Sequence, residues 1–199
     1  MTDLMNRPQP DCPADCPGTA ERGVDGHEPA TGERLNRLRA AVLGANDGIV
    51  STAAVVVGVA GATSDATTIA MSGLAAVIGG AVSMALGEYV SVSSQRDSER
   101  AMGLAEEMQV NPWSAAIASF LSFLLGAALP FATALLAPAS WRIAAIFVLT
   151  LVALALTGAL SAKLGEAPVA RSVTRIVVGG TTALAATFAI GSLFGANVG

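Results

Sequence analysis

The chain has 199 residues, of which 53% are hydrophobic and 13% are charged, and its mean hydropathy is +0.61. A soluble domain normally carries about 25% charged residues, so this composition excludes an ordinary soluble globular protein. The formal net charge of −4 arises from acidic residues concentrated in two short segments, and it indicates no nucleic-acid partner. We therefore expect an all-α membrane protein that lies in a lipid bilayer.

Residues 1–33 are rich in Pro, Gly, Asp and Glu and have almost no large hydrophobic side chains. Such a segment cannot bury enough apolar surface to fold alone, so we predict a disordered cytoplasmic tail. It also has no apolar stretch of the signal-peptide kind. Within it, Cys12 and Cys16 with His27 could collect metal, or the two cysteines could simply be reduced thiols.

Residues 34–199 contain five apolar segments, each long enough for a helix to cross a hydrocarbon core of about 30 Å. Residues 90–110 contain no Pro and only one Gly, so we expect the second helix to continue outside the membrane to about residue 108. Pro130 lies inside the third segment, where we expect a kink. The predicted helices are about 38–61, 69–93, 114–137, 141–162 and 172–195.

The basic residues predict how the helices are oriented. Ten of the 11 Lys and Arg residues lie before the first segment or near its start, after the second, or around the connection between the fourth and fifth. Only Arg142 falls on the opposite side. Because Lys and Arg accumulate in short cytoplasmic loops, we place the N-terminus in the cytoplasm and, with five crossings, the C-terminus outside.

Asp47 and Glu88 are the only acidic residues inside the five apolar segments. A carboxylate near the bilayer centre costs roughly 2.5 to 3.5 kcal/mol on insertion scales, and such residues usually line ion or proton pathways. Met84 lies four residues before Glu88 and shares its helix face, which continues to Ser91 and Gln95. On the first helix, Asp47 shares a predicted face with other small or polar residues, namely Gly44, Gly48 and Ser51.

Carboxylates bind Fe(II), Mn(II) and harder divalent ions, whereas a thioether favours softer transition metals. The set Asp47, Met84 and Glu88 therefore suits a divalent first-row metal rather than a structural zinc site. Alternatively, Asp47 caps a break in the first helix and Glu88 pairs with an Arg or a backbone amide. Glu106 and Glu107 are further candidate metal ligands, or they belong to a solvated extension of the second helix.

Glycine recurs in the first, second and fifth segments, and small residues let membrane helices approach closely. This pattern favours a tight bundle or a dimer. Five short helices enclose little space alone, so we place the pathway at the interface of a homodimer. Two copies would bring two sets of the acids together.

Two strings resemble signature regions of the vacuolar iron transporter family, which also includes manganese exporters and nodulin-like proteins. These are GANDGIVSTAAVVVGVAGA at 44–62 and GAVSMALGEYVSVSSQRDSE at 80–99. The resemblance extends over residues 34–197. It includes the family's last three helices, through NPWSAAIASFLSFLLGAALP at 111–130, the WR pair at 141–142 and TGALSAKLGEAPVARSVTRIVVGG at 157–180.

The resemblance implies a five-helix homodimer that exchanges cytoplasmic Fe(II) or Mn(II) for protons, with Asp47 and Met84 lining its pathway. Glu88 belongs to a GEY string typical of bacterial relatives, and Ala76 stands where some eukaryotic members carry an acid. Many members insert a glutamate-rich metal-binding domain between the second and third helices. This chain has only a short connection there, in which Glu106 and Glu107 resemble a remnant of that domain.

We therefore predict a transporter that removes divalent iron or manganese from the cytoplasm in exchange for protons, with the metal as cargo and no resident cofactor. The alternatives are a metal-binding membrane module without transport and an uncoupled divalent cation channel. No arrangement of nucleophile and base in the apolar segments indicates an enzyme. The composition favours a bacterial plasma membrane over a vacuolar membrane.

Overall fold

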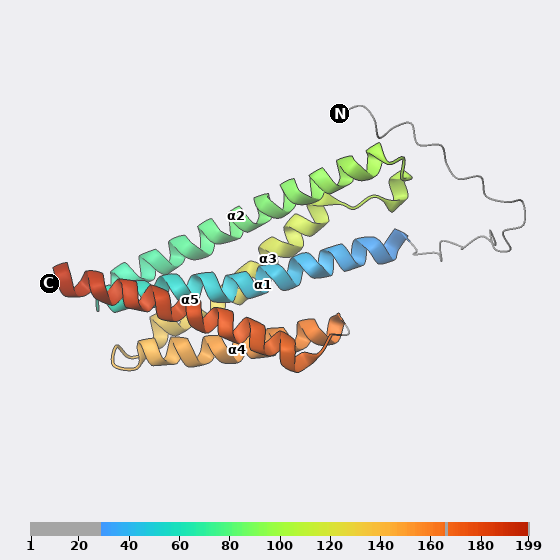
Figure 1. The fold of residues 1–199 in the computed structure, drawn as a ribbon. Coiled ribbons are helices and arrows are strands. Elements are labelled where there is room, and N and C mark those ends of the chain that lie inside the picture. Colours follow the sequence, from blue (N-terminus) through green and yellow to red (C-terminus); the bar gives the residue numbers. More distant parts are fainter. Residues whose placement is uncertain (1–28, 166, 199) are drawn as a thin grey trace, which may run out of the picture.

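The computed structural model describes residues 29–165 and 167–198. Most of the predicted tail lies outside this part, including Cys12, Cys16 and His27. The described part contains five long helices and one short 3-10 helix and has no strand, which confirms the predicted all-α class (Figure 1). Each long helix is long and apolar enough to cross a membrane. They are α1 (Pro29–Ala62), α2 (Ala66–Ala101), α3 (Pro112–Leu136), α4 (Arg142–Leu164) and α5 (Val169–Val198), with η1 (Glu106–Met108) between α2 and α3.

Two helices begin at side chains that accept hydrogen bonds from their first turn. Asp65 accepts from the backbone N–H and the hydroxyl of Thr68, both at 2.6 Å, at the start of α2. These hydrogen bonds lower the pKa of Asp65 below its usual value, and the hydrogen bond from the Thr68 hydroxyl has the larger effect. Asn111 accepts from the backbone N–H of Trp113 at 3.0 Å and begins α3, with Pro112 in the first turn.

The first two helices differ from their predicted limits. α1 begins at Pro29, nine residues before the predicted start at 38, and so includes the last residues of the predicted tail. α2 ends at Ala101, short of residue 108. The chain turns at Gly103, whose φ of 76° is unfavourable for other residues, so the single glycine of this segment ends the helix. α3, α4 and α5 end within three residues of their predicted limits.

α1 is the central helix, and it packs against each of the other four. Its closest approach to α3 depends on glycine, because a Cβ at Gly44 would meet the Ser119 backbone and one at Gly48 would meet the Phe123 backbone. Gly126 of α3 fits against the α1 backbone in the same way. The small residues thus bring α1 and α3 together closely, as expected from the sequence.

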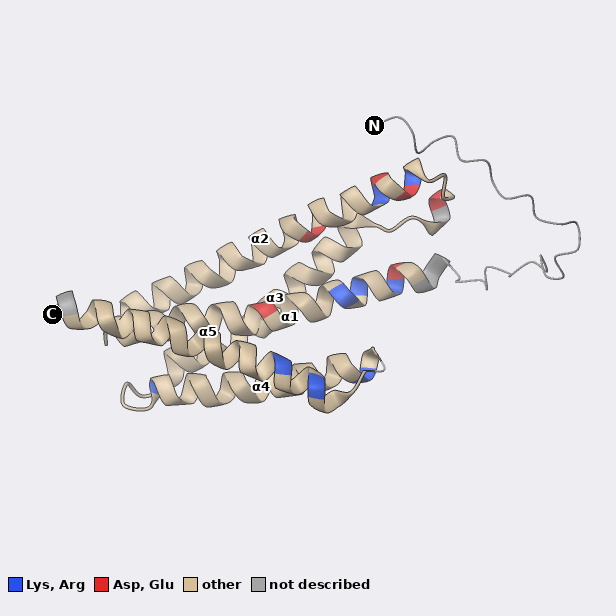
Figure 2. Ribbon diagram, in the orientation of Figure 1, with Lys and Arg blue, Asp and Glu red and all other residues tan. Residues whose placement is uncertain are grey.

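The outer helices cover α1 from different sides. Figure 1 shows α2 on one side of α1 and α4 with α5 on the other, with α1 and α2 diverging toward the end where α1 begins. Charged residues gather toward that end of the bundle (Figure 2). α2 also presents a row of exposed apolar side chains: Met71, Leu74, Ile78, Val82, Leu86 and Val90.

Candidate metal-binding groove

Asp47, Met84 and Glu88 line one groove between α1 and α2, with a volume of about 430 Å³. The structure therefore brings together three predicted ligands that are separated in sequence by up to 41 residues. The remaining lining residues are apolar, small or hydroxyl-bearing: Leu43, Ser51, Val55, Ala76, Gly80, Ser83 and Gly87.

Helical periodicity explains which side chains face the groove. On α1 the lining residues Leu43, Asp47, Ser51 and Val55 recur every four positions, so they form one continuous stripe. On α2 the lining residues form two adjacent rows with a four-residue period, Ala76, Gly80, Met84 and Glu88 in one and Ser83 and Gly87 in the other. Gly87 adds to the open space, because a Cβ there would meet nothing within 4 Å.

Only part of each helix face predicted from the sequence lines the groove. Gly44 and Gly48 do not line the groove but pack against α3, since successive residues of a helix point about 100° apart. Ser91 and Gln95 lie beyond the groove on the exposed surface of α2. Gln95 instead donates a hydrogen bond to the Glu99 carboxylate at 2.9 Å. The divergence of α1 and α2 at this end explains why the predicted stripe stops at Glu88 (Figure 1).

Glu88 is held by an arginine of the neighbouring helix. The Nη2 atom of Arg39 donates to the Glu88 Oε1 atom at 2.6 Å. The Glu88 side chain is 5% exposed, whereas that of Arg39 is 54% exposed, so the ion pair joins a buried acid to a base that reaches the surface. The pairing of Glu88 with an Arg was one of the alternatives left open by the sequence.

Arg39 is the residue of the site that sequence reasoning did not assign. A signal for it was present, because Arg39 lies eight residues before Asp47 and four before Leu43, on the same α1 stripe. The Asp47 carboxylate, by contrast, has no hydrogen bond or ion pair within the described chain, and only its backbone oxygen accepts, from the Ser51 hydroxyl at 2.6 Å. That carboxylate is half-buried and available to a ligand.

The three candidate ligands lie at different heights along the helices. With a rise of about 1.5 Å per residue, Asp47 lies about 22 Å from the Ala62 end of α1. Counted from Ala66 at the same end of the bundle, Met84 lies about 27 Å and Glu88 about 33 Å along α2. A hydrocarbon core is about 30 Å thick, so a core that began at the Ala62 end of the bundle would include Asp47 and would end near Glu88.

Glu106 lies apart from this groove. Its side chain is 79% exposed, and its carboxylate lies 3.6 Å from the Arg96 guanidinium. The side chain of Glu107 is outside the described part. Within residues 29–165 and 167–198, no three His, Cys, Asp or Glu side chains are grouped to hold a metal ion. The groove thus offers two carboxylates and a thioether from one copy, and Glu106 does not join them.

Comparison with known proteins assigns the chain to a family. The VIT family model matches residues 38–110 and 100–192. The chain belongs to the VIT family. This result confirms the resemblance seen in the sequence, and both residues 47 and 88 fall within the matched region.

Curated plant proteins are similar to this VIT family member over most of their length. Vacuolar iron transporter homolog 5 of Oryza sativa subsp. japonica is 44% identical over 173 residues, which cover 82% of this chain and 83% of the relative. Vacuolar iron transporter homolog 1 of Arabidopsis thaliana is 44% identical over 173 residues, covering 83% and 86%. Homolog 1 of the same rice is 43% identical over 194 residues, covering 88% and 84%.

Proposed function

We propose that this VIT family member transports Fe(II) or Mn(II) out of the cytoplasm in exchange for protons. The observation that carries the proposal is the convergence of Asp47, Met84 and Glu88 on one groove between two membrane-spanning helices. Carboxylate oxygens with one thioether suit these ions. The relatives are named vacuolar iron transporter homologs, which supports a metal cargo.

The depths of the ligands indicate the order in which the metal meets them. The ion enters at the arginine-bearing end, where Glu88 lies, and takes the place of Arg39 beside that carboxylate. It then passes Met84 and reaches Asp47 inside the hydrocarbon core. At each step a protein oxygen or sulfur replaces part of the hydration shell, which limits the cost of bringing the charge into the membrane.

Protons release the metal by competing for the same oxygens. A protonated carboxyl group is a poor ligand for a divalent ion, so protons that arrive from the opposite side displace the metal from Asp47. The protonated, neutral Asp47 then opens to the cytoplasmic side and releases its proton there before the next metal ion binds, which completes the exchange. When the groove is without metal, the Arg39 guanidinium neutralises Glu88, so neither state leaves Glu88 as an unpaired buried charge.

We further propose that the transporter is a homodimer. Asp47 is half-buried, and a carboxylate that faced lipid inside the hydrocarbon core would be costly. A second copy laid against the groove would cover Asp47 together with Leu43 and Val55, the exposed apolar residues of the same α1 stripe. It would also raise the ligand set to four carboxylates and two thioethers, enough to replace most of a hydration shell.

The direction of transport follows from the proposed orientation, with the arginine-bearing end and the N-terminus in the cytoplasm. We propose the bacterial plasma membrane as the location. The plant relatives are named vacuolar iron transporter homologs, which favours a vacuolar membrane as the alternative. In both membranes transport away from the arginine-bearing end lowers the cytoplasmic metal concentration.

The test is uptake of Fe(II) and Mn(II) into proteoliposomes of the purified chain, with and without an imposed pH gradient. Asp47→Asn should reduce flux to that of empty liposomes, because the amide is a much weaker ligand and cannot exchange a proton. Asp97→Asn is the matched control, since Asp97 is 76% exposed and lies outside the groove.

Flux that responds to the gradient and is lost only in Asp47→Asn supports the proposal. Metal binding without flux would identify a metal-binding module instead. Flux that is indifferent to the pH gradient would identify an uncoupled channel, and normal flux in Asp47→Asn would show that the groove is not the pathway.

A further inference from the structure

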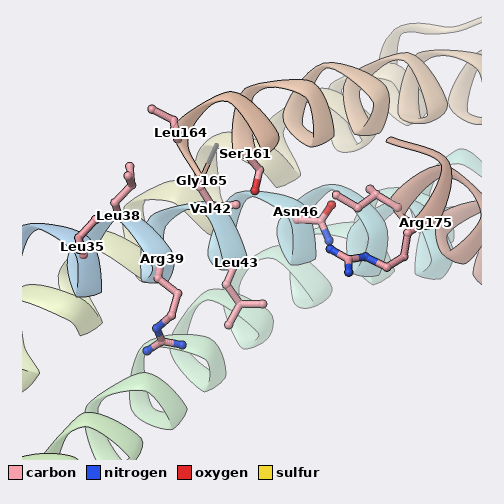
Figure 3. A pocket seen from close by; sticks show the side chains of 11 residues that line it. Leu35, Leu38, Arg39, Val42, Leu43, Asn46, Ser161, Leu164, Gly165 and Arg175 are labelled. Carbon is pink, nitrogen blue, oxygen red and sulfur yellow. The ribbon is translucent and has the colours of Figure 1, made fainter. Parts of the chain in front are cut away.

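A second cavity, of about 530 Å³, lies on the other side of α1, between α1, α4 and α5 (Figure 3). Its wall is largely apolar and includes Leu38, Val42, Leu164 and Ile176. Its polar lining side chains are Asn46, Ser161, Arg175 and Arg39, and Arg39 is the arginine that is paired with Glu88. It lies at the same end of the bundle as the arginines but shares only Leu43 with the lining of the metal-binding groove.

Two polar groups of this cavity have no partners within the described chain. Arg175 makes no hydrogen bond or ion pair with any described residue, in contrast with Arg39, which is paired with Glu88. The Oδ1 atom of Asn46 is buried and accepts no hydrogen bond from the described residues. Figure 3 shows the Arg175 guanidinium extending toward Asn46. An occupant of this cavity would therefore need a negative charge for the arginine and a donor for the amide oxygen.

The surrounding charges have the same sign. Four more basic residues lie at this end of α1, α4 and α5, and none of them forms an ion pair with a described residue: Arg34, Arg37, Lys163 and Arg171. Arg175 lies about 34 Å from the Val198 end of α5, slightly more than the thickness of a hydrocarbon core, so its charge can reach a membrane surface. An anion at this level would be attracted by the whole group.

We propose that the cavity binds one anionic glycerophospholipid from the leaflet at the arginine-bearing end of the bundle. The phosphate binds the Arg175 guanidinium, whose planar donors match phosphate oxygens. A headgroup hydroxyl donates to Asn46, and an acyl chain lies along the apolar wall formed by Leu38, Val42 and Ile176. Inorganic phosphate would satisfy the charge but leave that wall uncovered, so the combination of wall and charge favours a lipid.

The test compares phosphatidylglycerol with phosphatidylcholine on the purified, delipidated full chain. Bound lipid is counted by native mass spectrometry, and the thermal midpoint is measured with each lipid. The unchanged chain should retain one phosphatidylglycerol in preference to phosphatidylcholine. Arg175→Gln should reduce this retention at least about fivefold, which corresponds to roughly 1 kcal/mol.

Two further variants separate this site from general attraction. Lys163→Gln removes the same charge at the same end, but Lys163 does not line the cavity, so it should reduce retention much less than Arg175→Gln does. Ser161→Phe keeps every charge and fills the apolar space beside Ser161, so it should also lose the bound lipid. Arg175 is exposed and has no described partner, so its substitution should not impair folding.

Three results would overturn the proposal. They are equal losses of lipid in Lys163→Gln and Arg175→Gln, equal retention of phosphatidylcholine by the unchanged chain, and stabilisation by sodium phosphate as large as that by phosphatidylglycerol. The last result would identify the occupant as a free anion.

Discussion

The two sides of α1 differ in how their charges are satisfied. The groove shared with α2 contains two acids, and its outer acid Glu88 is paired with Arg39 at 2.6 Å. The cavity shared with α4 and α5 is lined by the unpaired Arg175, the unpaired Asn46 amide oxygen and part of Arg39, with no acid among its lining residues. The α2 side therefore suits a cation and the α4–α5 side suits an anion. The consecutive residues Asp47 and Asn46 line these two sides respectively.

The comparison shows how finely a membrane helix can divide its surface. Asn46, Asp47 and Gly48 are consecutive, and each is rotated about 100° from the one before. They face the α4–α5 side, the α2 groove and the α3 backbone respectively. Each substitution in this triplet should therefore affect a different property of the protein.

The largest effect is expected at Gly48, where α1 touches α3. Gly48→Leu would force a side chain into the Phe123 backbone, which cannot move aside without separating the helices. We expect the free energy of unfolding to fall by about 3 kcal/mol or more, so that little folded protein is recovered. Size-exclusion chromatography in detergent, followed by a heating series, measures this effect.

Gly79→Leu is the matched control, because a Cβ at Gly79 meets nothing within 4 Å. It should give normal yield and normal thermal stability. Normal behaviour of Gly48→Leu would show that α1 and α3 are packed less closely than described.

The second effect separates the two members of the ion pair at the groove entrance. Glu88→Gln should weaken Mn(II) binding about 10-fold, or roughly 1.4 kcal/mol, because a ligand is lost. Arg39→Gln should tighten binding by a similar factor, since the metal no longer competes with a guanidinium for Glu88. Isothermal titration with Mn(II) measures both.

Arg37→Gln is the control for Arg39, because Arg37 lies on the same helix and outside the groove. It should leave the affinity unchanged. If Arg39→Gln weakened binding as Glu88→Gln does, the arginine would be needed to position Glu88, and the competition argument would fail.

The third effect concerns the thioether. Met84→Leu nearly conserves volume, so the fold should tolerate it at a cost below about 1.5 kcal/mol. It removes the soft donor, and we expect the ratio of Fe(II) to Mn(II) uptake to fall severalfold. Met71→Leu, on the exposed side of the same helix, should leave the ratio unchanged. An unchanged ratio in Met84→Leu would remove sulfur from the ligand set.

The smallest effect is expected at Asp65, an acid outside both cavities. Its pKa is lowered in the folded protein, chiefly by the hydrogen bond from the Thr68 hydroxyl. The stabilisation is therefore complete above the unfolded-state pKa and is lost as the pH falls through the lower folded-state pKa. Asp65→Ala should have a slightly lower thermal midpoint at neutral pH, and the difference should disappear in acid. A difference that persists at low pH would mean that the carboxylate charge is not its source.

Much of the fold could be predicted because the bilayer imposes it locally. Apolar segments of about 20 residues indicate membrane helices, and three of the five helices end within three residues of their predicted limits. The errors occurred where polar segments continue a helix outside the membrane. There a single residue such as Gly103 can end the helix, and composition gives no sharp limit.

The candidate ligands could also be predicted, since an acid within an apolar helix is conspicuous in the sequence. Asp47 and Glu88 were identified in this way, and Met84 by its spacing from Glu88. The partner of Glu88 could not be predicted in this way, because Arg39 lies 49 residues away on another helix. Glu106 was included because of its charge, but its nearest basic partner is Arg96, at the exposed end of α2.

The sequence alone determined the number of membrane helices, the identity of the buried acids and the resemblance to a family, because each depends on residues close together in the chain. The tertiary structure decided which helix covers each side of α1. It placed Asp47 opposite Met84, Gly48 against α3, and Asn46 beside Arg175. Helical periodicity states which residues share a face, but only the packing of distant segments determines what that face contacts.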